Sequence, residues 1–365
     1  MKRKKVLCLI PSFGGGGAER QMTELINCLN DNGIEVSVIT NSPENVYSHE
    51  IPATRYNINE TNRLLCLVKT YFLIRSLKFD SLISFGDKSN LTAILSSYPF
   101  KRFRLIVSER NFTINLGWKD RLRFFLFKRV DYIVSNNKSQ ANFISKNFKA
   151  LNNKIKTIHN FTDVSIFKAK FKKNNNQEII KVGIFARYAP QKNITSLIKA
   201  AAILKRTNNN IYRFYWFGKK YLEDKNSSIL LPTYVSAHKL VLDLDLEKEF
   251  LLNSFSKKPE YDINDMDVIS LPSFHEGFSN SISEALACGK PVIASDVSDN
   301  SIIVERNIEG FLFDPHNINS IVDAFRNYSE LNTQAKKTMS LNARKKAEKL
   351  FSKEIFAAEY IDLII

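Results

Sequence analysis

The first forty residues constrain the fold most, because they place a glycine run between a strand pattern and a helix pattern. An apolar run at residues 5–10 is followed by four glycines at 14–17, a helical stretch at 18–30 and a second apolar run at 34–40. This order is typical of a βαβ unit, in which a helix joins two parallel strands. The sequence therefore predicts a parallel sheet with a glycine-rich turn after its first strand.

The same alternation continues along the chain. Further strands are expected at residues 81–84, 105–107, 132–134, 179–185, 212–217, 268–271 and 291–294, and helices at 195–205, 282–287 and most of 318–347. Such alternation favours parallel sheets that helices cover on both faces. A polar run, KKNNNQE, interrupts the pattern, and we assign residues 173–178 as a linker.

These patterns predict two domains, which agrees with a length of 365 residues. We expect an α/β chain of two doubly wound, Rossmann-like domains that face each other across a cleft. The N-terminal domain is expected to span residues 1–172 and the C-terminal domain residues 179–347. Residues 348–365 are expected to form a helix that packs back towards the N-terminal domain.

The chain has a formal net charge of +16, and its N-terminal half holds all of that excess. Residues 1–175 contain 29 Lys and Arg against 13 Asp and Glu, whereas the remainder contains 24 of each. Such a charge distribution favours an anionic partner, which could be nucleic acid, an acidic substrate or an anionic membrane. Composition does not choose among these partners.

Two basic, aromatic segments of that half, residues 63–78 and 118–130, have the length of helices. In the second segment one helical face carries Trp118, Leu122, Phe125 and Leu126, beside five Lys and Arg. A helix of this kind can lie in the interface of a bilayer, or it can pack its apolar face on the core behind a solvated basic rim. Both interpretations stay open at this point.

The cysteines and the apolar runs bear on the compartment. The four cysteines, Cys8, Cys28, Cys66 and Cys288, form no CxxC pair and no dense framework, which indicates a reducing compartment. The apolar run after the basic residues 2–5 is too short for a signal peptide, and no stretch is long and apolar enough to span a membrane.

The glycine run at residues 14–17 lies where backbone N–H groups and a helix N-terminus can approach a phosphate. No Lys-Ser or Lys-Thr follows it, and Arg20 stands where a dinucleotide-binding fingerprint has its third glycine. ATP hydrolysis and NAD binding are therefore poorly supported. A flexible turn without a ligand is the alternative.

Arg187 and Lys192 lie five positions apart in the loop after the strand expected at 179–185. A guanidinium and an ammonium group suit a diphosphate, the first by gripping two oxygens and the second as a point charge. Two cations after a strand are commonplace, so this pair is informative only in combination with other motifs.

Residues 271–293 (LPSFHEGFSNSISEALACGKPVI) carry the most specific pattern. A strand ends before a loop that contains Glu276, and a helix starts near residues 279–281. Glu284 follows Glu276 by eight positions, so both carboxylates can line one pocket beside exposed N–H groups of the helix start. One carboxylate can then bind sugar hydroxyls and the other a ribose.

This segment resembles the E-x7-E signature of the retaining glycosyltransferases of family 4, which have a GT-B fold and use nucleotide diphosphate sugars. The GGAER sequence of the glycine loop, the R-x4-K spacing of Arg187 and Lys192, and the sequence GKPVI at 289–293 resemble further family elements. The resemblance covers nearly the whole chain. It implies an N-terminal domain that binds the acceptor and a C-terminal domain that binds the nucleotide sugar.

The resemblance also implies a role for each matched residue. Arg187 and Lys192 are expected to bind the donor diphosphate, and together with Glu276, which contacts the donor sugar, they form the expected catalytic set. Glu284 is expected to hold the ribose. The remaining nucleotide-sugar contacts are expected from Gly277, Phe278, Ser279 and Asn280.

In the N-terminal domain, Gly16 and Gly17 are expected to approach the donor phosphates. Many family members place a histidine after an N-domain strand to contact the donor sugar, but this chain has Glu109 and Arg110 there. These two residues are our candidates for that contact. His159, near the end of the domain, is expected to act in packing or as a hinge.

Two Asp-x-Asp triplets, at residues 243–245 and 265–267, could suggest a metal-bridged diphosphate. Hard cations need several converging oxygens, and neither triplet follows the glycine loop, so we expect structural roles for both. No metal and no other cofactor is expected, since the nucleotide sugar is a substrate.

The sequence thus predicts a retaining, metal-independent glycosyltransferase that moves a hexose or N-acetylhexosamine from a UDP-linked donor to a lipid-linked or polysaccharide acceptor in bacterial surface polysaccharide synthesis. The expected partners are the donor, the acceptor and an anionic membrane surface that binds the basic N-terminal domain, without nucleic acid. The expected location is cytoplasmic and peripheral on the inner face of the cell membrane. The alternatives are a membrane- or nucleic-acid-binding protein on a degenerate α/β scaffold and a nucleotide-sugar epimerase.

Overall fold

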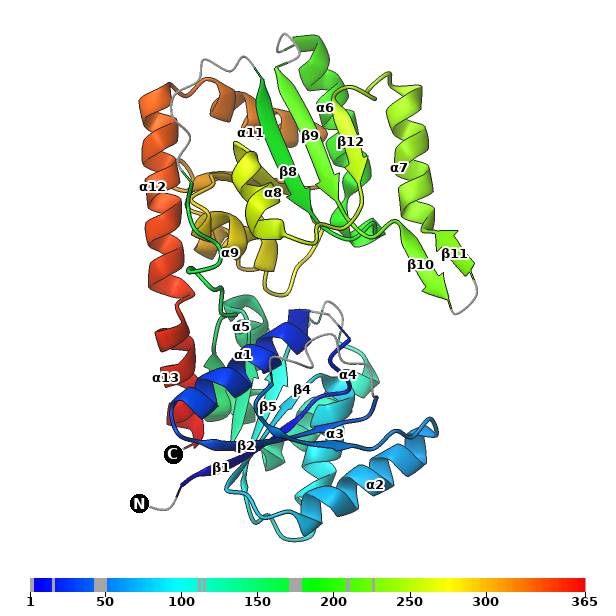
Figure 1. The fold of residues 1–365 in the computed structure, drawn as a ribbon, viewed down its shortest axis with the longest axis vertical. Helices are drawn as coiled ribbons and strands as arrows, with labels where there is room; N and C mark the ends of the chain where they lie inside the picture. The colour runs from blue at the N-terminus through cyan, green and yellow to red at the C-terminus, as the bar shows by residue number, and fades with distance from the viewer. Residues whose placement is uncertain are drawn as a thin grey trace. The chain divides into compact units, whose positions relative to one another are not determined.

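The computed structural model describes residues 3–14, 17–42, 51–110, 113, 116–170, 179–207, 211–224 and 227–364. The chain divides into two compact units. The first consists of residues 1–161 together with 353–365, and the second of residues 162–352. Figure 1 traces the chain through both units.

The first unit is built on a parallel sheet with the strand order β3-β2-β1-β4-β5-β6-β7. Its strands are β1 (Lys5–Leu9), β2 (Glu35–Thr40), β3 (Thr54–Asn57), β4 (Ser81–Phe85), β5 (Arg104–Glu109), β6 (Tyr132–Ser135) and β7 (Ile155–Thr157). The central strands are buried, which is why they appear in the sequence as continuous apolar runs.

Helices cover both faces of this sheet. The core on one face contains α1 (Gly17–Asp31) and α13 (Lys353–Ile364). The helices on the other face are α2 (Arg63–Ser76), α3 (Asp87–Ser96), α4 (Trp118–Leu126) with η2 (Phe127–Arg129), and α5 (Lys138–Asn147) with η3 (Lys149–Lys154). Because strand side chains alternate, Cys8 packs into the first core and its neighbours Leu7 and Leu9 into the second.

The second unit has a parallel sheet with the order β12-β9-β8-β13-β14-β15. Its strands are β8 (Ile180–Phe185), β9 (Tyr212–Phe217), β12 (Phe250–Asn253), β13 (Val268–Leu271), β14 (Val292–Ser295) and β15 (Gly310–Phe313). A separate antiparallel hairpin is formed by β10 (Tyr221–Asp224) and β11 (Ser227–Leu230).

Two helical layers enclose this second sheet. The elements are η4 (Pro190–Lys192), α6 (Ile194–Thr207), α7 (Pro232–Asp243), α8 (Pro259–Asp265), α9 (Asn280–Ala287), α10 (Asn300–Ile303), α11 (Ile318–Ser329) and α12 (Thr333–Leu350). Helix α6 packs against α7 and α11, whereas α9 packs against α12. The crossovers through α6 and α9 run in opposite directions along the sheet, so right-handed connections place these helices on opposite faces.

The division between the units falls after Phe161, whereas the sequence pattern suggested residue 172. Residues 162–170 group with the second unit because their backbone bonds to it. The Thr162 N–H donates to the Phe351 carbonyl at 3.1 Å, and the Arg344 guanidinium donates to the carbonyls of Val164 and Phe167 at 3.2 and 2.8 Å. The linker assigned to 173–178 lies outside the described residues.

The C-terminal end of the chain belongs to the first unit. Helix α12 ends at Leu350, and α13 starts at Lys353, whose Nζ lies 2.7 Å from a carboxylate oxygen of Asp31. Tyr360 and Phe356 of α13 are buried in the core that α1 shares. Within the described part of the chain, no helix has the length and apolar character needed to cross a membrane.

Gly310 opens β15 at a point where the backbone of β14 approaches closely. A Cβ at this position would lie 1.7 Å from the Val292 carbonyl oxygen. We predict that Gly310→Ala destabilises the second unit by about 1–3 kcal/mol, because the two paired strands must move apart. Scanning calorimetry should show a lower unfolding midpoint.

The control is Gly117→Ala, whose added Cβ meets a side-chain oxygen of Asp120 at 3.4 Å, an ordinary contact. This variant should unfold within about 0.5 kcal/mol of the wild type. Equal midpoints for Gly310→Ala and the wild type would contradict the close approach.

Candidate functional site

The strand order of the second sheet reverses between β8 and β13. From β8 the chain proceeds outward to β9 and β12, and from β13 it proceeds the other way to β14 and β15. In doubly wound sheets, ligands bind at the carboxyl ends of the strands that flank such a reversal. The loops after β8 and after β13 therefore form the candidate site of this unit.

The loop after β8 carries both predicted cations. Arg187 lies two residues beyond the strand, and its side chain is exposed. Lys192 ends the short η4 turn, and Asn193 adopts a left-handed backbone conformation with φ of 54° before α6 begins. The buried Asn193 amide donates to the Pro315 carbonyl at 2.9 Å, which fixes the position of this turn.

The loop after β13 is tied to the loop after β8 by three polar contacts. The Nζ of Lys192 lies 2.5 Å from Oε1 of Glu276. Beside this pair, the Gln191 amide donates to the His275 carbonyl at 2.6 Å, and the Phe274 N–H donates to the Gln191 carbonyl at 2.9 Å. The structure thus brings together two predicted site residues that are 84 positions apart.

The Lys192–Glu276 pair is largely withdrawn from solvent, with side chains 14% and 8% exposed. Partial burial weakens screening by water and salt, so each charge depends strongly on its partner. A polyanionic ligand that enters this site therefore meets an ammonium that is already shared with a carboxylate. The pair can respond to such a ligand, because the carboxylate and the ligand compete for the same cation.

The residues after Glu276 lead into helix α9. The Ser298 hydroxyl donates to the Glu276 carbonyl at 2.5 Å, and the Ser279 hydroxyl donates to Asn300 at 2.9 Å. The Ser279 side chain makes no capping bond to the helix start. The N-terminus of α9, at Asn280, therefore places the partial positive charge of its first backbone N–H groups at this edge of the sheet.

Glu284 and Phe278 are held differently from each other. Glu284 lies in the second turn of α9 and is 8% exposed. The Phe278 ring packs edge-on against Phe351, with 5.5 Å between the ring centroids, and belongs to the core. Phe278 can therefore meet a ligand only through its backbone, as Gly277 must.

In the first unit, the strand order reverses between β1 and β4. Gly17, the last residue of the glycine run after β1, is the first residue of α1. Gly16 lies outside the described residues. Of the predicted pair, Glu109 is the last residue of β5, the neighbour of β4, and Arg110 is the residue after it.

Glu109 is buried at the end of β5, and its burial raises the pKa of its carboxyl to about 7. Its carboxylate lies 3.5 Å from Nη2 of Arg123 and accepts a hydrogen bond from the Asn90 amide. Arg123 also pairs with Asp87 and Asp120. This network lies on the α3 and α4 side of the sheet.

Arg110 lies on the opposite side. Its Nη2 donates to Asn160 at 2.7 Å, and its guanidinium lies 4.7 Å from the centroid of the Phe85 ring. Burial lowers the pKa of the Arg110 guanidinium. The structure therefore separates the two candidates, since consecutive side chains at a strand end point to opposite faces.

His159 lies on the loop that follows β7. Its Nδ1 lies 3.2 Å from the Asn136 carbonyl oxygen. This local contact is compatible with the packing role expected for it.

The two Asp-x-Asp triplets have structural contacts. Asp267 accepts a hydrogen bond from the Lys181 N–H at 2.9 Å, and Asp265 pairs with the Lys181 ammonium at 3.0 Å. Asp245 occupies a left-handed turn with φ of 52°. Among the residues that the structure describes, no three His, Cys, Asp or Glu side chains gather in a way that could hold a metal ion.

A shallow cavity of about 460 Å³ lies in the first unit, at the amino ends of β4 and β5. Its carboxylates are already engaged, since Asp80 accepts from the Lys5 N–H and Asp131 accepts from the Leu105 N–H. It lies at the edge of the sheet that is opposite the glycine run, so we do not include it in the candidate site.

Two family models match the chain and together span residues 15–346. Residues 15–166 match the family described as Glycosyltransferase Family 4, and residues 165–346 match the family described as Glycosyl transferases group 1. The module boundary at 165–166 lies close to the division between the two compact units.

A curated relative and two solved structures are similar to this chain. The N-acetylgalactosamine-N,N'-diacetylbacillosaminyl-diphospho-undecaprenol 4-alpha-N-acetylgalactosaminyltransferase of Campylobacter jejuni is 26% identical over 80% of this chain and 81% of its own. A glycosyltransferase from Rickettsia africae superposes with a TM-score of 0.85 at 17% identity, over 100% of this chain and 98% of its own. HepE of Anabaena, in complex with UDP, superposes with a TM-score of 0.80 at 20% identity, over 98% of both chains.

The fold agreement extends over the whole chain, and the family models assign its two halves separately. This chain is therefore a glycosyltransferase of the GT-B fold, and it belongs to glycosyltransferase family 4, with a group 1 module as its second half.

Proposed function

We propose that this enzyme transfers a hexose or N-acetylhexosamine from a UDP-sugar to a lipid-linked saccharide, with retention and without a metal, in the synthesis of a bacterial surface polysaccharide such as O-antigen, capsule or exopolysaccharide. The observation that carries the proposal is the contact of Lys192 with Glu276 at the reversal point of the second sheet. It joins the R-x4-K loop to the E-x7-E segment. The relative from Campylobacter jejuni is named for a diphospho-undecaprenol acceptor, and HepE binds UDP, which supports both ends of the reaction.

In this proposal Arg187 and Lys192 bind the donor diphosphate, and the amide end of α9, including Ser279 and Asn280, adds further positive potential. Departure of the nucleoside diphosphate develops negative charge, and fixed cations and backbone dipoles stabilise that charge without a metal. Glu276 contacts the donor sugar and Glu284 the ribose.

The first unit supplies the acceptor side. Gly17 lies at the N-terminus of α1, next to the reversal point of the first sheet. We assign Gly17, together with Gly16, to contact with the donor phosphates. Arg110 keeps its role as a candidate donor-sugar contact, since its Nε and Nη1 have no hydrogen-bond partner among the described residues. Glu109 is held by Arg123, so we assign it to positioning rather than to contact with the sugar.

A lipid-linked acceptor requires the enzyme to work at a membrane. We propose a cytoplasmic enzyme that is peripheral on the inner face of the cell membrane, with its basic first unit towards anionic lipid and with no nucleic-acid partner. An epimerase would act on the nucleotide sugar alone, and a binding scaffold would transfer nothing, so transfer to an acceptor separates the three functions.

The first prediction concerns donor binding. We expect UDP and one class of UDP-sugar to bind the wild type, and Arg187→Ala or Glu284→Ala to weaken that binding by about 10- to 100-fold, the usual loss for a hydrogen bond to a charged group. Isothermal calorimetry measures this. Lys205→Ala, on the far end of α6, is the control and should bind as the wild type does. Equal affinity in all four proteins would refute the assigned site.

The second prediction separates the members of the ion pair. Lys192→Ala should weaken UDP binding at least about tenfold, because a charge-assisted contact to phosphate is lost. Glu276→Gln should keep or tighten UDP binding, since the ammonium is released for the phosphate, yet lower kcat by more than about 100-fold. Calorimetry and single-turnover kinetics give both values. Weaker UDP binding in Glu276→Gln would show that the carboxylate does not compete with the ligand.

The third prediction concerns stereochemistry and metal. The product linkage should have the anomeric configuration of the donor, which one-bond carbon–proton couplings in NMR measure. The rate should be the same within error in EDTA and in added Mg²⁺, because the charge on the diphosphate is met by Arg187 and Lys192. An inverted linkage refutes retention, and loss of rate in EDTA refutes the metal-free mechanism.

A further inference from the structure

The exposed hydrophobic side chains of the first unit are concentrated on one face. Of its eleven large hydrophobic side chains described as exposed, ten lie between residues 64 and 125. We call this set the apolar face: Leu64, Leu65, Val68 and Phe72 of α2, Leu91 of α3, Tyr98 and Phe100 after α3, and Trp118, Leu122 and Phe125 of α4. Phe100 and Trp118 are the most prominent aromatic rings, 74% and 72% exposed.

The helices of this face carry more apolar surface than the core uses. In α4, Trp118, Leu122 and Phe125 follow one another at intervals of four and three residues and point to solvent, whereas Phe124 is buried. The core-facing alternative for residues 118–130 is thus wrong for these three side chains. An exposed stripe with this spacing is typical of a helix that lies against an apolar medium.

The loop that presents Phe100 is held firmly from both sides. The Arg75 guanidinium of α2 donates to the carbonyls of Ser96, Tyr98 and Phe100 at 3.0–3.3 Å. From the other side, the Arg129 guanidinium of η2 donates to the carbonyls of Ser97 and Pro99, and it lies 4.8 Å from the centroid of the Tyr98 ring. The loop is therefore a fixed projection rather than a loose turn.

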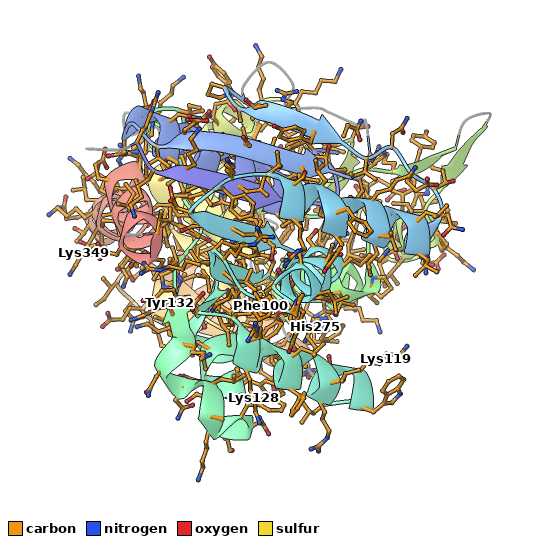
Figure 2. The ribbon with its side chains drawn as sticks, turned by 90° about the horizontal axis from the view of Figure 1, so that it is seen from below. Phe100, Lys119, Lys128, Tyr132, His275 and Lys349 are labelled. Atoms are coloured by element: carbon orange, nitrogen blue, oxygen red, sulfur yellow. The ribbon has the colours of Figure 1, made fainter. Side chains whose placement is uncertain are left out.

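The elements of the apolar face are joined to one another. Helix α2 packs against α3, and an ion pair of 2.8 Å between Asp87 and Arg123 joins α3 to α4. Figure 2, which views the molecule from below, places Lys119 and Lys128 near the two ends of the segment formed by α4 and η2. Packing and polar contacts therefore join α2, α3, α4 and the 97–101 loop, which carry the side chains of the apolar face.

Cations surround and interleave this face. Residues 63–129 contain fourteen Lys and Arg against four Asp and Glu. Of these, Arg110 lies on the opposite side of the sheet, and Glu109 is buried. The Lys119 ammonium lies 5.6 Å from the Trp118 ring, and that of Lys128 lies 4.8 Å from the Phe125 ring. Lys and Arg with aromatic rings beside them are suited to a surface whose outer layer is anionic and whose interior is apolar.

We propose that this face docks on an anionic bilayer, with Phe100, Trp118 and the adjacent apolar side chains in the headgroup and acyl boundary and the cations on lipid phosphates. A second copy of the chain does not fit the face, because its own apolar face carries the same positive charge. Nucleic acid fits it poorly, because aliphatic side chains such as Leu64, Val68 and Leu122 offer no ring on which a base can stack.

The docking face rests on the proposed function in one respect, since it explains how a lipid-linked acceptor and this enzyme meet. The geometry itself does not depend on the reaction. Membrane binding can accordingly be measured without donor, acceptor or turnover.

Tryptophan fluorescence tests insertion directly, because the chain has two tryptophans and only one of them is exposed. Trp118 is 72% exposed and Trp216 is 0% exposed. With vesicles of phosphatidylglycerol and phosphatidylcholine, the wild type should show a blue shift and quenching by brominated lipid, and Trp118→Phe should lose both signals while it still binds. Vesicle binding without a change at Trp118 would overturn insertion.

Two exposed loop phenylalanines form a matched pair for the apolar contribution. Phe100 is 74% exposed on the docking face, and Phe255 is 70% exposed in the second unit. Phe100→Ser should lower partitioning to the same vesicles by about three- to tenfold, whereas Phe255→Ser should leave it unchanged. Equal partitioning of the two variants would overturn the assignment of the face.

Charge reversal provides a second matched pair. The triple variant Lys119→Glu, Arg121→Glu, Lys128→Glu should lower partitioning at least about tenfold. The triple variant Lys337→Glu, Lys345→Glu, Lys349→Glu on α12 changes the net charge equally and should reduce it far less. An equal loss of partitioning in both triple variants would mean that net charge alone attracts the protein to the vesicles, which would overturn the assigned face. If nucleic acid or self-association shifts the Trp118 fluorescence more than vesicles do, that partner replaces the bilayer as the occupant.

The failure of this inference and of the proposed function can be told apart. Calorimetry with UDP reports the second unit, and vesicle partitioning reports the first. UDP binding without vesicle binding overturns only the docking face, and vesicle binding without UDP binding overturns only the proposed reaction. Circular dichroism melts that match the wild type show that each variant is folded.

Discussion

The parallel pairing of β8 with β13 is the constraint on which the candidate site depends. These two strands are separated by more than eighty residues, and each is followed by a loop that carries part of the predicted motif set. Because parallel strands present their carboxyl ends at one edge, the pairing places both loops side by side. The Lys192–Glu276 contact then joins them. Without that pairing, the R-x4-K and E-x7-E elements are only two distant stretches of sequence.

Close packing behind these loops keeps the site rigid. Gly218 follows β9, and a Cβ at that position would lie within 2.4 Å of the Ala186 carbonyl. The indole N–H of Trp216 donates to the same carbonyl at 2.9 Å, and the Tyr188 ring stacks on Trp216. The backbone immediately before Arg187 is therefore fixed by buried aromatic groups. A cation on a rigid segment loses less entropy when it binds phosphate than a cation on a mobile one.

Sequence patterns predicted the buried parts of the fold well and the exposed parts poorly. Strands β9 and β13 occur at the residues expected from their apolar runs. β13 is buried at every residue and β9 at every second residue, and buried strands consist mainly of apolar residues. Strand β3, with the sequence TRYN, is mostly exposed and carries no such run, and it was not predicted. Its pairing with β2 supplies hydrogen bonds that local sequence does not reveal.

The site shows the same limit at the level of single side chains. The family resemblance implied that Lys192 and Glu276 act in one site, and the structure places them in contact. It did not reveal that the Phe278 ring points into the core, because Phe351, its packing partner, lies far along the chain. Nor did it reveal that Glu109 and Arg110 serve opposite faces. Their separation depends on where β5 ends, and strand ends are the least predictable feature of a sequence.

The uneven charge of the chain follows from the two kinds of anion that we propose it meets. A nucleoside diphosphate is small, so two cations and a helix N-terminus are enough for it, and residues 176–365 can keep 24 positive and 24 negative side chains. A membrane surface is extended and screened over a Debye length of about 10 Å, so only many cations spread over one face attract it strongly. The excess positive charge therefore belongs on the unit that carries the exposed aromatic rings, and not on the unit with the most specific binding motif.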